Sequence, residues 1–252
     1  MRTNKTKEKL QSGGTVFGCL VRYPDAGLVE FLGYQGWDFL VFDGEHGPME
    51  PRDCEHMVRA AELRAVTPIV RVTTNQPPII LRFMDTGAQG LHVPWVSSAA
   101  DAEMAVRSVK YHPRGIRGLA NMRAAEYGQT IPLSRYIEKA NAETLTIIQI
   151  ETLDGVEHAS EIAGVDGVDV IFVGPTDLSH SLGVPGQFQH PTVRAAIERV
   201  ADVAARSNVA LGAIASDAQT AREWLDCGAR YILVTLESLV KSTVQQFLGQ
   251  LK

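Results

Sequence analysis

Residues 145–177 read LTIIQIETLDGVEHASEIAGVDGVDVIFVGPTD, in which two apolar runs, Leu145–Ile150 and Val170–Val173, flank a stretch of helical character. Both runs are apolar almost throughout instead of alternating, which is typical of strands covered on both faces in a parallel sheet. Polar residues follow each run, with Glu151 directly after the first and Asp177 shortly after the second. This unit predicts an α/β fold with polar side chains at the strand ends.

The same unit recurs along the whole chain. Eight apolar runs alternate with helical stretches, and they cover Val16–Val21, Phe39–Phe42, Pro68–Val72, Gly90–Trp95, Leu145–Ile150, Val170–Val173, Val209–Ile214 and Tyr231–Thr235. Eight such strands with helical returns favour a closed (β/α)₈ barrel, or TIM barrel, over an open sheet. Because no linker or short repeat interrupts the pattern, we expect one domain over residues 1–252.

The stretches between the runs carry helix signals. Ala99–Lys110 and Pro191–Ala205 have apolar residues three and four positions apart, and Gly228 stands where a helix C-terminal cap is expected. Residues 111–144 form the one long connection, and such a connection in a compact domain is usually functional. Four arginines lie in it: Arg114, Arg117, Arg123 and Arg135.

Composition excludes several function classes. The net charge is −5, which argues against nucleic acid as the main partner because phosphate binding requires a basic face. We expect no signal peptide and no membrane span, since the N-terminal segment is polar and no run approaches 18 apolar residues. Cys19, Cys54 and Cys227 lie far apart without a zinc-like spacing, which predicts reduced thiols in a cytoplasmic protein.

The active site of an α/β barrel lies at the C-terminal ends of its strands. Polar residues occupy this position after four of the predicted strands. They are Asp43 to His46, Arg71, Gln149 with Glu151, and Gly174 to Asp177. We expect these four groups to meet at one mouth.

Glu151 and Asp177 are the candidate metal ligands. Hard cations such as Mg²⁺ and Mn²⁺ take oxygen ligands, commonly one or two carboxylates completed by water and substrate oxygens. The alternatives are that Glu151 serves as an N-cap or salt-bridge carboxylate and that Asp177 caps the following helix. The occurrence of the pair on adjacent strands favours the metal site.

Arg71 and Gln149 are the candidate substrate-binding side chains. A guanidinium at a strand end can bind a carboxylate with two hydrogen bonds, although Arg71 could instead form an internal salt bridge with Asp43 or Glu45. Gln149 faces the same way as Glu151, because alternate residues of a strand share a face. It could donate to a substrate oxygen or simply fill the mouth.

His46 is the candidate acid–base group. It lies three residues after Asp43, and an imidazole oriented by a carboxylate is the usual form of a general base near neutral pH. The alternative is that His46 has a purely structural role. Glu45 is expected to contact Asp43 and His46 without contacting substrate. Asp43 on the same short loop favours the catalytic interpretation.

Other polar and aromatic residues point to packing. Trp95 and Trp224 fit core or mouth positions, and His92 fits a barrel-interior histidine with its hydrogen bonds satisfied. The glycine-rich stretches match neither a Walker loop nor a dinucleotide fingerprint, so we expect neither ATP nor NAD. No lysine ends any of the eight runs, which favours metal-assisted over Schiff-base chemistry.

A family resemblance rests on six motifs in order along the chain. They are Phe42-Asp43-Gly44-Glu45-His46-Gly47-Pro48, Val70-Arg71-Val72, Gly87-Ala88-Gln89-Gly90 through Val93-Pro94, Pro113-Arg114-Gly115-Ile116-Arg117-Gly118, Gln149-Ile150-Glu151-Thr152 and Phe172-Val173-Gly174-Pro175-Thr176-Asp177-Leu178-Ser179. Together they resemble the HpcH/HpaI aldolase family.

The resemblance implies a role for each candidate. The matching positions are Glu151 and Asp177 for the metal, Arg71 for the pyruvate carboxylate, Gln149 for substrate contact, Asp43 and His46 for the base dyad, and Gly174, Pro175 and Thr176 for backbone contacts to substrate. It also implies a hexamer, a dimer of trimers, in which the C-terminal helix is exchanged between barrels. Arg117 or Arg123 could then serve the site of a neighbouring subunit.

The activity implied is that of a class II aldolase. A divalent ion (Mg²⁺ or Mn²⁺, with Co²⁺ also suitable) would stabilise the enolate of pyruvate or hydroxypyruvate while a 4-hydroxy-2-oxo acid is made from, or cleaved to, that acid and an aldehyde. Oxaloacetate decarboxylation or acyl-CoA lysis through the same enolate is an alternative. A non-catalytic barrel that binds a small acid is another.

Overall fold

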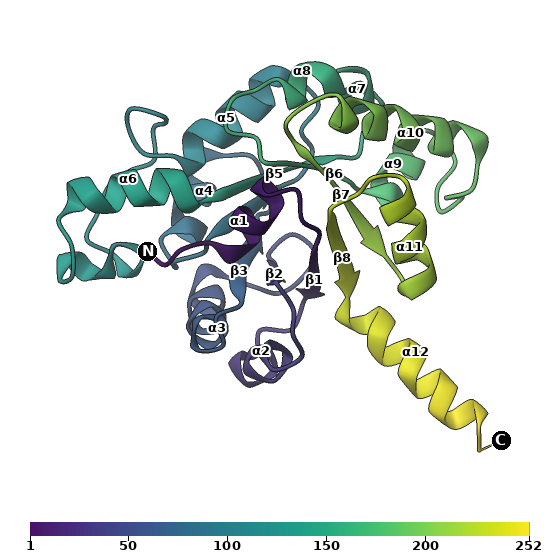
Figure 1. The fold of residues 1–252 in the computed structure, drawn as a ribbon, viewed down its shortest axis with the longest axis horizontal. Coiled ribbons are helices and arrows are strands. Elements are labelled where there is room, and N and C mark those ends of the chain that lie inside the picture. The colour runs from purple at the N-terminus through teal and green to yellow at the C-terminus, as the bar shows by residue number, and fades with distance from the viewer. Residues whose placement is uncertain (252) are drawn as a thin grey trace.

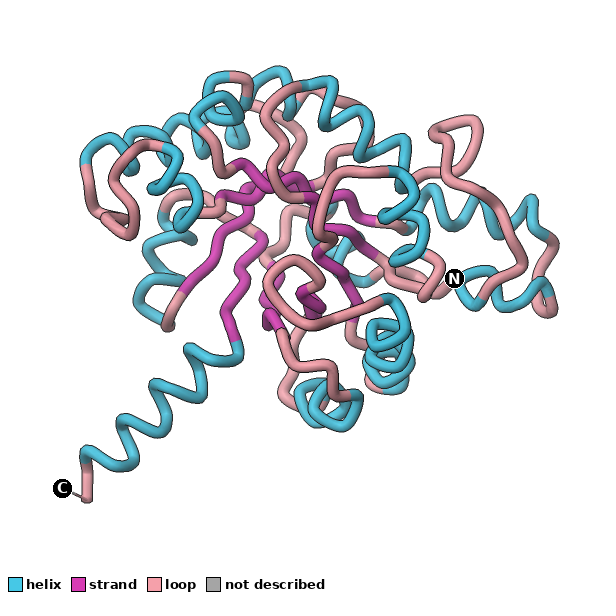
Figure 2. The backbone as a smooth tube through the Cα atoms, turned by 180° about the vertical axis from the view of Figure 1, so that it is seen from behind, coloured by secondary structure: helices cyan, strands magenta, loops and turns pink. Residues whose placement is uncertain are grey.

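The protein, described by a computed structural model over residues 1–251, forms a closed barrel of eight parallel strands in sequential order (Figures 1 and 2). Lys252, the last residue of the expected domain, lies outside the described residues. The strands are β1 (Val16–Val21), β2 (Phe39–Asp43), β3 (Thr67–Arg71), β4 (Gly90–Val93), β5 (Leu145–Ile150), β6 (Val170–Val173), β7 (Ala210–Ala215) and β8 (Tyr231–Thr235). The predicted TIM barrel is confirmed.

Strand bounds agree with the predicted runs except at a few ends. The largest difference is at β4, which ends at Val93, whereas the apolar run continues to Trp95. The chain turns there because Trp95 takes a left-handed conformation, with φ of 58°. Its backbone N–H consequently points to a side chain at the mouth instead of continuing the strand ladder.

Helices surround the barrel, and most begin with a recognisable cap. They are α1 (Lys5–Gln11), α2 (Ala26–Gly33), α3 (Pro51–Leu63), α4 (Pro77–Met84), α5 (Ala99–Val109), α6 (Leu133–Glu143), α7 (Leu153–Glu157), α8 (Ala159–Ala163), α9 (Pro175–Ser181), α10 (Pro191–Ala205), α11 (Ala218–Asp226) and α12 (Leu236–Gly249), with a 3₁₀ turn η1 (Arg123–Gly128). Gly228, two residues past α11, has φ of 86°, as expected of a glycine at a helix C-terminus.

Glycine and aromatic residues complement one another inside the barrel. A Cβ on Gly18 would lie 2.2 Å from the ring of Phe39, and a Cβ on Gly212 would lie 2.9 Å from that of Phe172. Phe39 in turn stacks on Tyr231 with ring centroids 4.2 Å apart. The missing side chains therefore leave room for large rings that fill the interior and hold it rigid.

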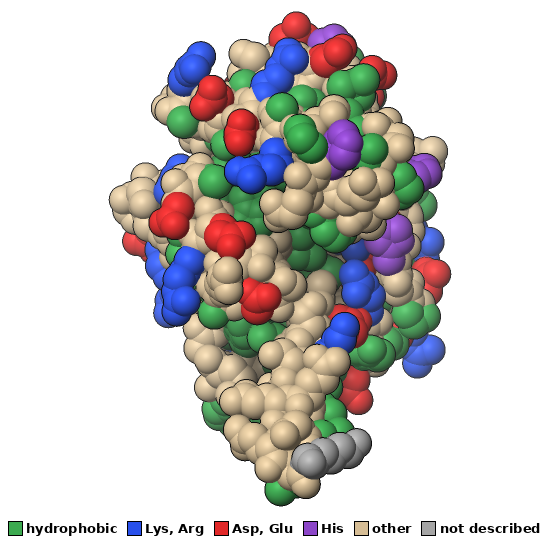
Figure 3. All heavy atoms as spheres, turned by 90° about the vertical axis from the view of Figure 1, so that its right-hand side faces the viewer, with side chains coloured by type: hydrophobic (Ala, Val, Ile, Leu, Met, Phe, Trp, Pro, Cys, Tyr) green, Lys and Arg blue, Asp and Glu red, His purple; other side chains and the backbone are tan. Residues whose placement is uncertain are grey.

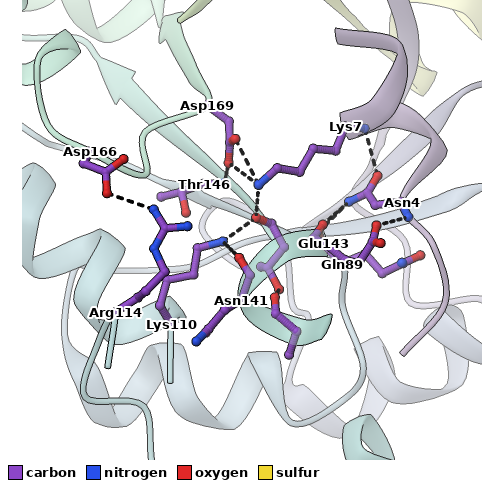
Figure 4. A network of polar contacts seen from close by, with 12 residues as sticks. Asn4, Lys7, Gln89, Lys110, Arg114, Asn141, Glu143, Thr146, Asp166 and Asp169 are labelled. Carbon is purple, nitrogen blue, oxygen red and sulfur yellow. Dashed lines mark hydrogen bonds and ion pairs between the residues drawn. The ribbon is translucent and has the colours of Figure 1, made fainter. Parts of the chain in front are cut away.

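Two buried lysines close the N-terminal end of the barrel, here called the base (Figure 4). Lys7 Nζ donates to the carbonyl of Thr144 (2.9 Å) and pairs with Asp169 (3.1 Å). Lys110 Nζ donates to the carbonyls of Asn141 (2.9 Å) and Thr144 (2.7 Å). Helix α1 is thereby tied to the strands that start beneath it.

The long connection between β4 and β5 packs as η1 and α6 instead of forming an open loop. The side chain of Arg117 is buried, pairs with Asp85 (2.9 Å) and stacks over the ring of Tyr111. Arg123 pairs with Glu62 and donates to the carbonyl of Thr86. Both arginines are thus engaged within their own chain.

Helix α12 leaves the barrel and extends away from it (Figures 1 and 2). None of its residues is buried. Its first turns pack Leu236 and Leu239 against the core, but the large apolar side chains further along it are exposed, as is one just beyond its end; they are Val240, Val244, Phe247, Leu248 and Leu251. The molecular face that includes the helix is hollowed near its middle, with hydrophobic side chains in the hollow (Figure 3). Within residues 1–251, no helix is both long and apolar enough to cross a membrane.

Candidate active site

The C-terminal ends of β2, β3 and β5 bring the predicted polar residues to one mouth. Asp43, Arg71, Gln149 and Glu151 are all buried there, whereas Asp177, in the first turn of α9, is half-buried. The charge of Asp177 contributes to a raised pKa of Glu151, after burial and the charge of Glu45. The convergence expected from strand ends is therefore present.

Arg71 and Asp43 form a two-point ion pair. Arg71 Nε lies 2.9 Å from Asp43 Oδ1, and Arg71 Nη2 lies 2.6 Å from Asp43 Oδ2. Burial alone would raise the pKa of Asp43, but the hydrogen bonds and charge of Arg71 hold it below its usual value. Arg71 Nη1 also lies 3.3 Å from Glu45 Oε2. The internal salt bridge anticipated as an alternative is thus formed, and it fixes the guanidinium in place.

Asp43 contacts His46 through the backbone N–H of that residue and makes no hydrogen bond to its imidazole. Asp43 Oδ1 accepts hydrogen bonds from the backbone N–H groups of Glu45 (3.1 Å) and His46 (3.2 Å), and its remaining contacts go to arginines. The imidazole is 52% exposed, and its Nε2 lies 3.9 Å from Glu45 Oε2. Asp43 consequently orders the loop that carries His46, while the ring itself faces Glu45.

Two hydrogen bonds hold the Glu151 carboxylate. Gln149 Nε2 donates to Oε2 (2.5 Å), and the backbone N–H of Trp95 donates to Oε1 (2.8 Å). Gly174 leaves the space that this arrangement needs, since a Cβ there would lie 2.8 Å from Glu151 Oε2. The left-handed backbone of Trp95 is therefore explained by the carboxylate that it binds.

Neither Glu151 nor Asp177 acts as a helix N-cap. Thr152 caps α7 with its own side chain, and Gly174 occupies the cap position of α9. The capping alternatives are therefore wrong.

The mouth carries more buried negative charge than its own cations balance. Burial, with smaller contributions from the charges of Glu45 and Asp177, raises the pKa of Glu151 to about 7, although its hydrogen bonds from Gln149 and Trp95 act in the opposite direction. The pKa of Glu45 is raised as well, again by burial first. Its Oε2 is buried without a hydrogen bond.

A divalent cation fits such a donor set. Carboxylate oxygens are the ligands that hard cations prefer, and a positive ion would relieve this repulsion. Within residues 1–251 no cluster of three or more metal-ligating side chains occurs. Substrate and water would therefore complete the coordination.

Two contributors escaped the sequence reasoning. Arg22 directly follows β1, and its Nε binds Asp43 Oδ2 (3.0 Å) while its Nη1 lies 3.4 Å from Glu237 at the start of α12. The strand-end rule that selected Arg71 would have selected Arg22 as well. The backbone donor of Trp95 carried no such signal, because a main-chain N–H is the same for nearly every residue type.

A protein-family model for "HpcH/HpaI aldolase/citrate lyase" matches residues 17–240. The chain belongs to this family. It is 36% identical over 236 residues to a hydroxypyruvate/pyruvate aldolase of Roseobacter denitrificans, covering 93% of this chain and 91% of that protein. A 5-keto-4-deoxy-D-glucarate aldolase of Escherichia coli K12 is 36% identical over 231 residues, covering 92% and 90%.

Solved structures agree with this assignment. An HpcH/HpaI aldolase/citrate lyase family protein from Burkholderia cenocepacia superposes with a TM-score of 0.93 at 34% identity, with 99% of each chain covered. The resemblance found in the sequence motifs is thus confirmed for this HpcH/HpaI family member, together with its barrel fold.

Proposed function

We propose that the protein is a class II aldolase that makes and cleaves 4-hydroxy-2-oxo acids through the enolate of pyruvate or hydroxypyruvate. The proposal is supported by the names of its relatives, which act on related 2-oxo acids. It also accords with the buried carboxylates beside a fixed arginine at the barrel mouth. The single observation that carries it is the excess of buried negative charge around Glu151, which suits a site built for a cation.

The donor acid would bind through Arg71. Its Nε and Nη2 are held by Asp43 and its Nη1 lies 3.3 Å from Glu45, so the guanidinium keeps one orientation, and the N–H groups that these carboxylates leave unused would bind the ligand. Such a preorganised guanidinium can bind a carboxylate and add positive charge near the developing enolate oxygen. Free backbone N–H groups in the first turn of α9, after Gly174 and Pro175, would contact the same carboxylate from Thr176 onward.

Glu151 and Asp177 would hold a divalent ion, Mg²⁺ or Mn²⁺ with Co²⁺ also suitable, and that ion supplies Lewis-acid stabilisation of the enolate. Gln149 would position Glu151 and offer an amide to the substrate. His46, exposed at the mouth, would carry the proton to and from the aldol hydroxyl. Asp43 supports this step by ordering the loop.

The test is exchange of pyruvate's methyl protons with heavy water, followed by proton NMR. We expect exchange with Mg²⁺ or Mn²⁺ and its loss after complete chelation of the metal. No aldehyde is needed in the assay, because the enolate forms before the aldehyde reacts. Exchange that survives metal removal would contradict the roles of Glu151 and Asp177. Absence of exchange with pyruvate, hydroxypyruvate and oxaloacetate would favour the non-catalytic barrel instead.

We also propose that the protein assembles, as the resemblance implies, into a hexamer with exchanged C-terminal helices. Support comes from α12, which buries none of its own residues and carries an apolar stripe. Sedimentation of the wild type and of Phe247→Glu tests this, with dissociation expected for the variant. A cytoplasmic location belongs to the same proposal, in line with three unpaired cysteines.

A further inference from the structure

Four buried polar side chains run in sequence from the barrel interior to the mouth. They are Tyr231 on β8, His92 on β4, Gln149 on β5 and Glu151 just beyond β5. None of them exposes more than 2% of its surface. Polar groups buried this deeply require hydrogen-bond partners, since an unpartnered one has lost its contacts with water and gained nothing in return.

Both ends of this series are already hydrogen-bonded. Tyr231 Oη lies 2.9 Å from His92 Nε2, and Gln149 Nε2 donates to Glu151 Oε2. Within these four side chains, the buried atoms without a hydrogen-bond partner are His92 Nδ1 and Gln149 Oε1. His92 pairs with Ile147 across β4 and β5, so Gln149, two residues further along β5, faces the same way as His92 on the neighbouring strand. One bond between these two atoms would complete the series.

Only one direction of donors satisfies every atom. In its ionised form the Glu151 carboxylate can only accept, so the NH₂ group of Gln149 faces it and the amide oxygen faces His92. His92 Nδ1 must then carry the proton, which leaves Nε2 as the acceptor for the phenol of Tyr231. The opposite tautomer would set two acceptors against each other at Gln149 and leave the phenol proton without an acceptor.

We propose that Tyr231, His92 and Gln149 form a directed hydrogen-bond chain that holds the Glu151 carboxylate in one orientation. Tyr231 and His92 are positioning residues, because they reach the mouth only through Gln149. The significance of the chain rests on the proposed function, which makes Glu151 a metal ligand. The existence of the hydrogen-bond chain and the direction of its donors do not depend on that function.

Packing holds the rings in the geometry that the chain requires. Phe172 meets His92 edge-on with centroids 4.9 Å apart, and Phe39 stacks on Tyr231. Burial, followed by the charge of Arg71, lowers the pKa of His92 to about 3, so the ring is neutral at physiological pH. A neutral imidazole has one donor and one acceptor, as the chain requires.

The first test reads the tautomer directly. Magic-angle-spinning NMR of the metal-free protein, with ring ¹⁵N-labelled histidine, assigns the His92 signals by their loss in His92→Asn. We expect Nδ1 protonated and Nε2 bare at neutral pH. Tyr231→Phe should shift the Nε2 resonance towards that of a nitrogen without a hydrogen bond. A proton on Nε2 in the wild type would overturn the proposal.

The second test measures binding of Mn²⁺ alone by calorimetry. Tyr231→Phe should weaken it about tenfold, the scale of losing an outer partner of a ligand. Tyr136→Phe is the matched control, since it removes another buried phenol that contacts Tyr111; it should leave affinity unchanged.

Two variants of His92 separate positioning from packing. Asn places an N–H near the position of Nδ1, whereas Gln places one near Nε2, so His92→Asn should retain affinity that His92→Gln loses. Equal losses in both would overturn the chain. A wild type that binds no Mn²⁺ would contradict the proposed metal site, and the tautomer would still decide the chain.

Discussion

The two ends of the barrel treat buried charge in opposite ways. At the base, the ammonium groups of Lys7 and Lys110 lie among carbonyls and Asp169, so each donor has an acceptor. At the mouth, burial raises the pKa of both Glu45 and Glu151, and the charge of Glu45 adds to the shift of Glu151, while Arg71 lies 3.3 Å from Glu45 as a close positive charge. At the base the folded chain supplies acceptors for the buried ammonium groups, whereas at the mouth Glu45 Oε2 is buried without a hydrogen bond.

Paired substitutions at the two ends should give opposite results, and this is the largest effect that we expect. Glu151→Gln should lower turnover about 10³-fold or more, because it removes charge that contributes several kcal/mol to the transition state. It should leave the free energy of unfolding unchanged or higher, because the ionised carboxylate is disfavoured by burial.

Asp169→Asn at the base is the matched variant. It leaves Lys7 without its carboxylate and should lower the free energy of unfolding by about 2 kcal/mol or more while turnover persists. Denaturant unfolding and steady-state kinetics on both proteins check the contrast. Loss of activity and stability together in either variant would mean that the two ends are not independent.

His46→Ala tests whether a residue at the mouth acts in the reaction without contributing to stability. Its half-exposed ring contributes little to the fold, so stability should hold while retro-aldol turnover falls about 10²–10⁴-fold, the span for one acid–base group. Thermal unfolding and kinetics measured on the same preparation separate the two effects. Unchanged turnover would remove His46 from the mechanism.

The smallest effect concerns Lys110. Burial, followed by the charge of Lys7, lowers its pKa to about 7 from an ordinary 10.5. The folded state therefore binds this proton less tightly than the unfolded state does. Stability is reduced increasingly as pH falls from 10.5 to 7, and conversely it rises with pH across that window.

Lys110→Met should flatten this rise, which melting temperatures of both proteins between pH 7 and 10 will show. Lys139→Met, on the outer helix α6, is the control and should leave the profile unchanged. Identical slopes for Lys110→Met and the wild type would mean that Lys110 keeps an ordinary pKa in the fold.

The barrel and the positions of its polar residues could be read from the sequence because both depend on local periodicity. Runs that are apolar throughout identify covered strands, and the residue after such a run must lie at the strand end. This reasoning located Glu151 and Arg71. It applies equally to Arg22, which was overlooked.

Side-chain directions could not be read in the same way. Asp43 lies three residues from His46, yet its side chain pairs with Arg71 and Arg22, which lie at the ends of other strands. The turn at Trp95 likewise depends on a carboxylate 56 positions further along the chain. Lys7 and Lys110 are buried against the starts of strands that lie far from them in the sequence. The residues next to either lysine in the sequence therefore do not indicate that it is buried.

The clamped turn at Trp95 also gives the protein an optical reporter. Its indole is about half exposed although its backbone is bound to Glu151, whereas Trp37 and Trp224 pack against the hydrophobic core. A molecule that binds at Glu151 should change the polarity around the Trp95 indole more than around the other two indoles. Ligand binding should therefore be visible in the intrinsic fluorescence, without any label attached.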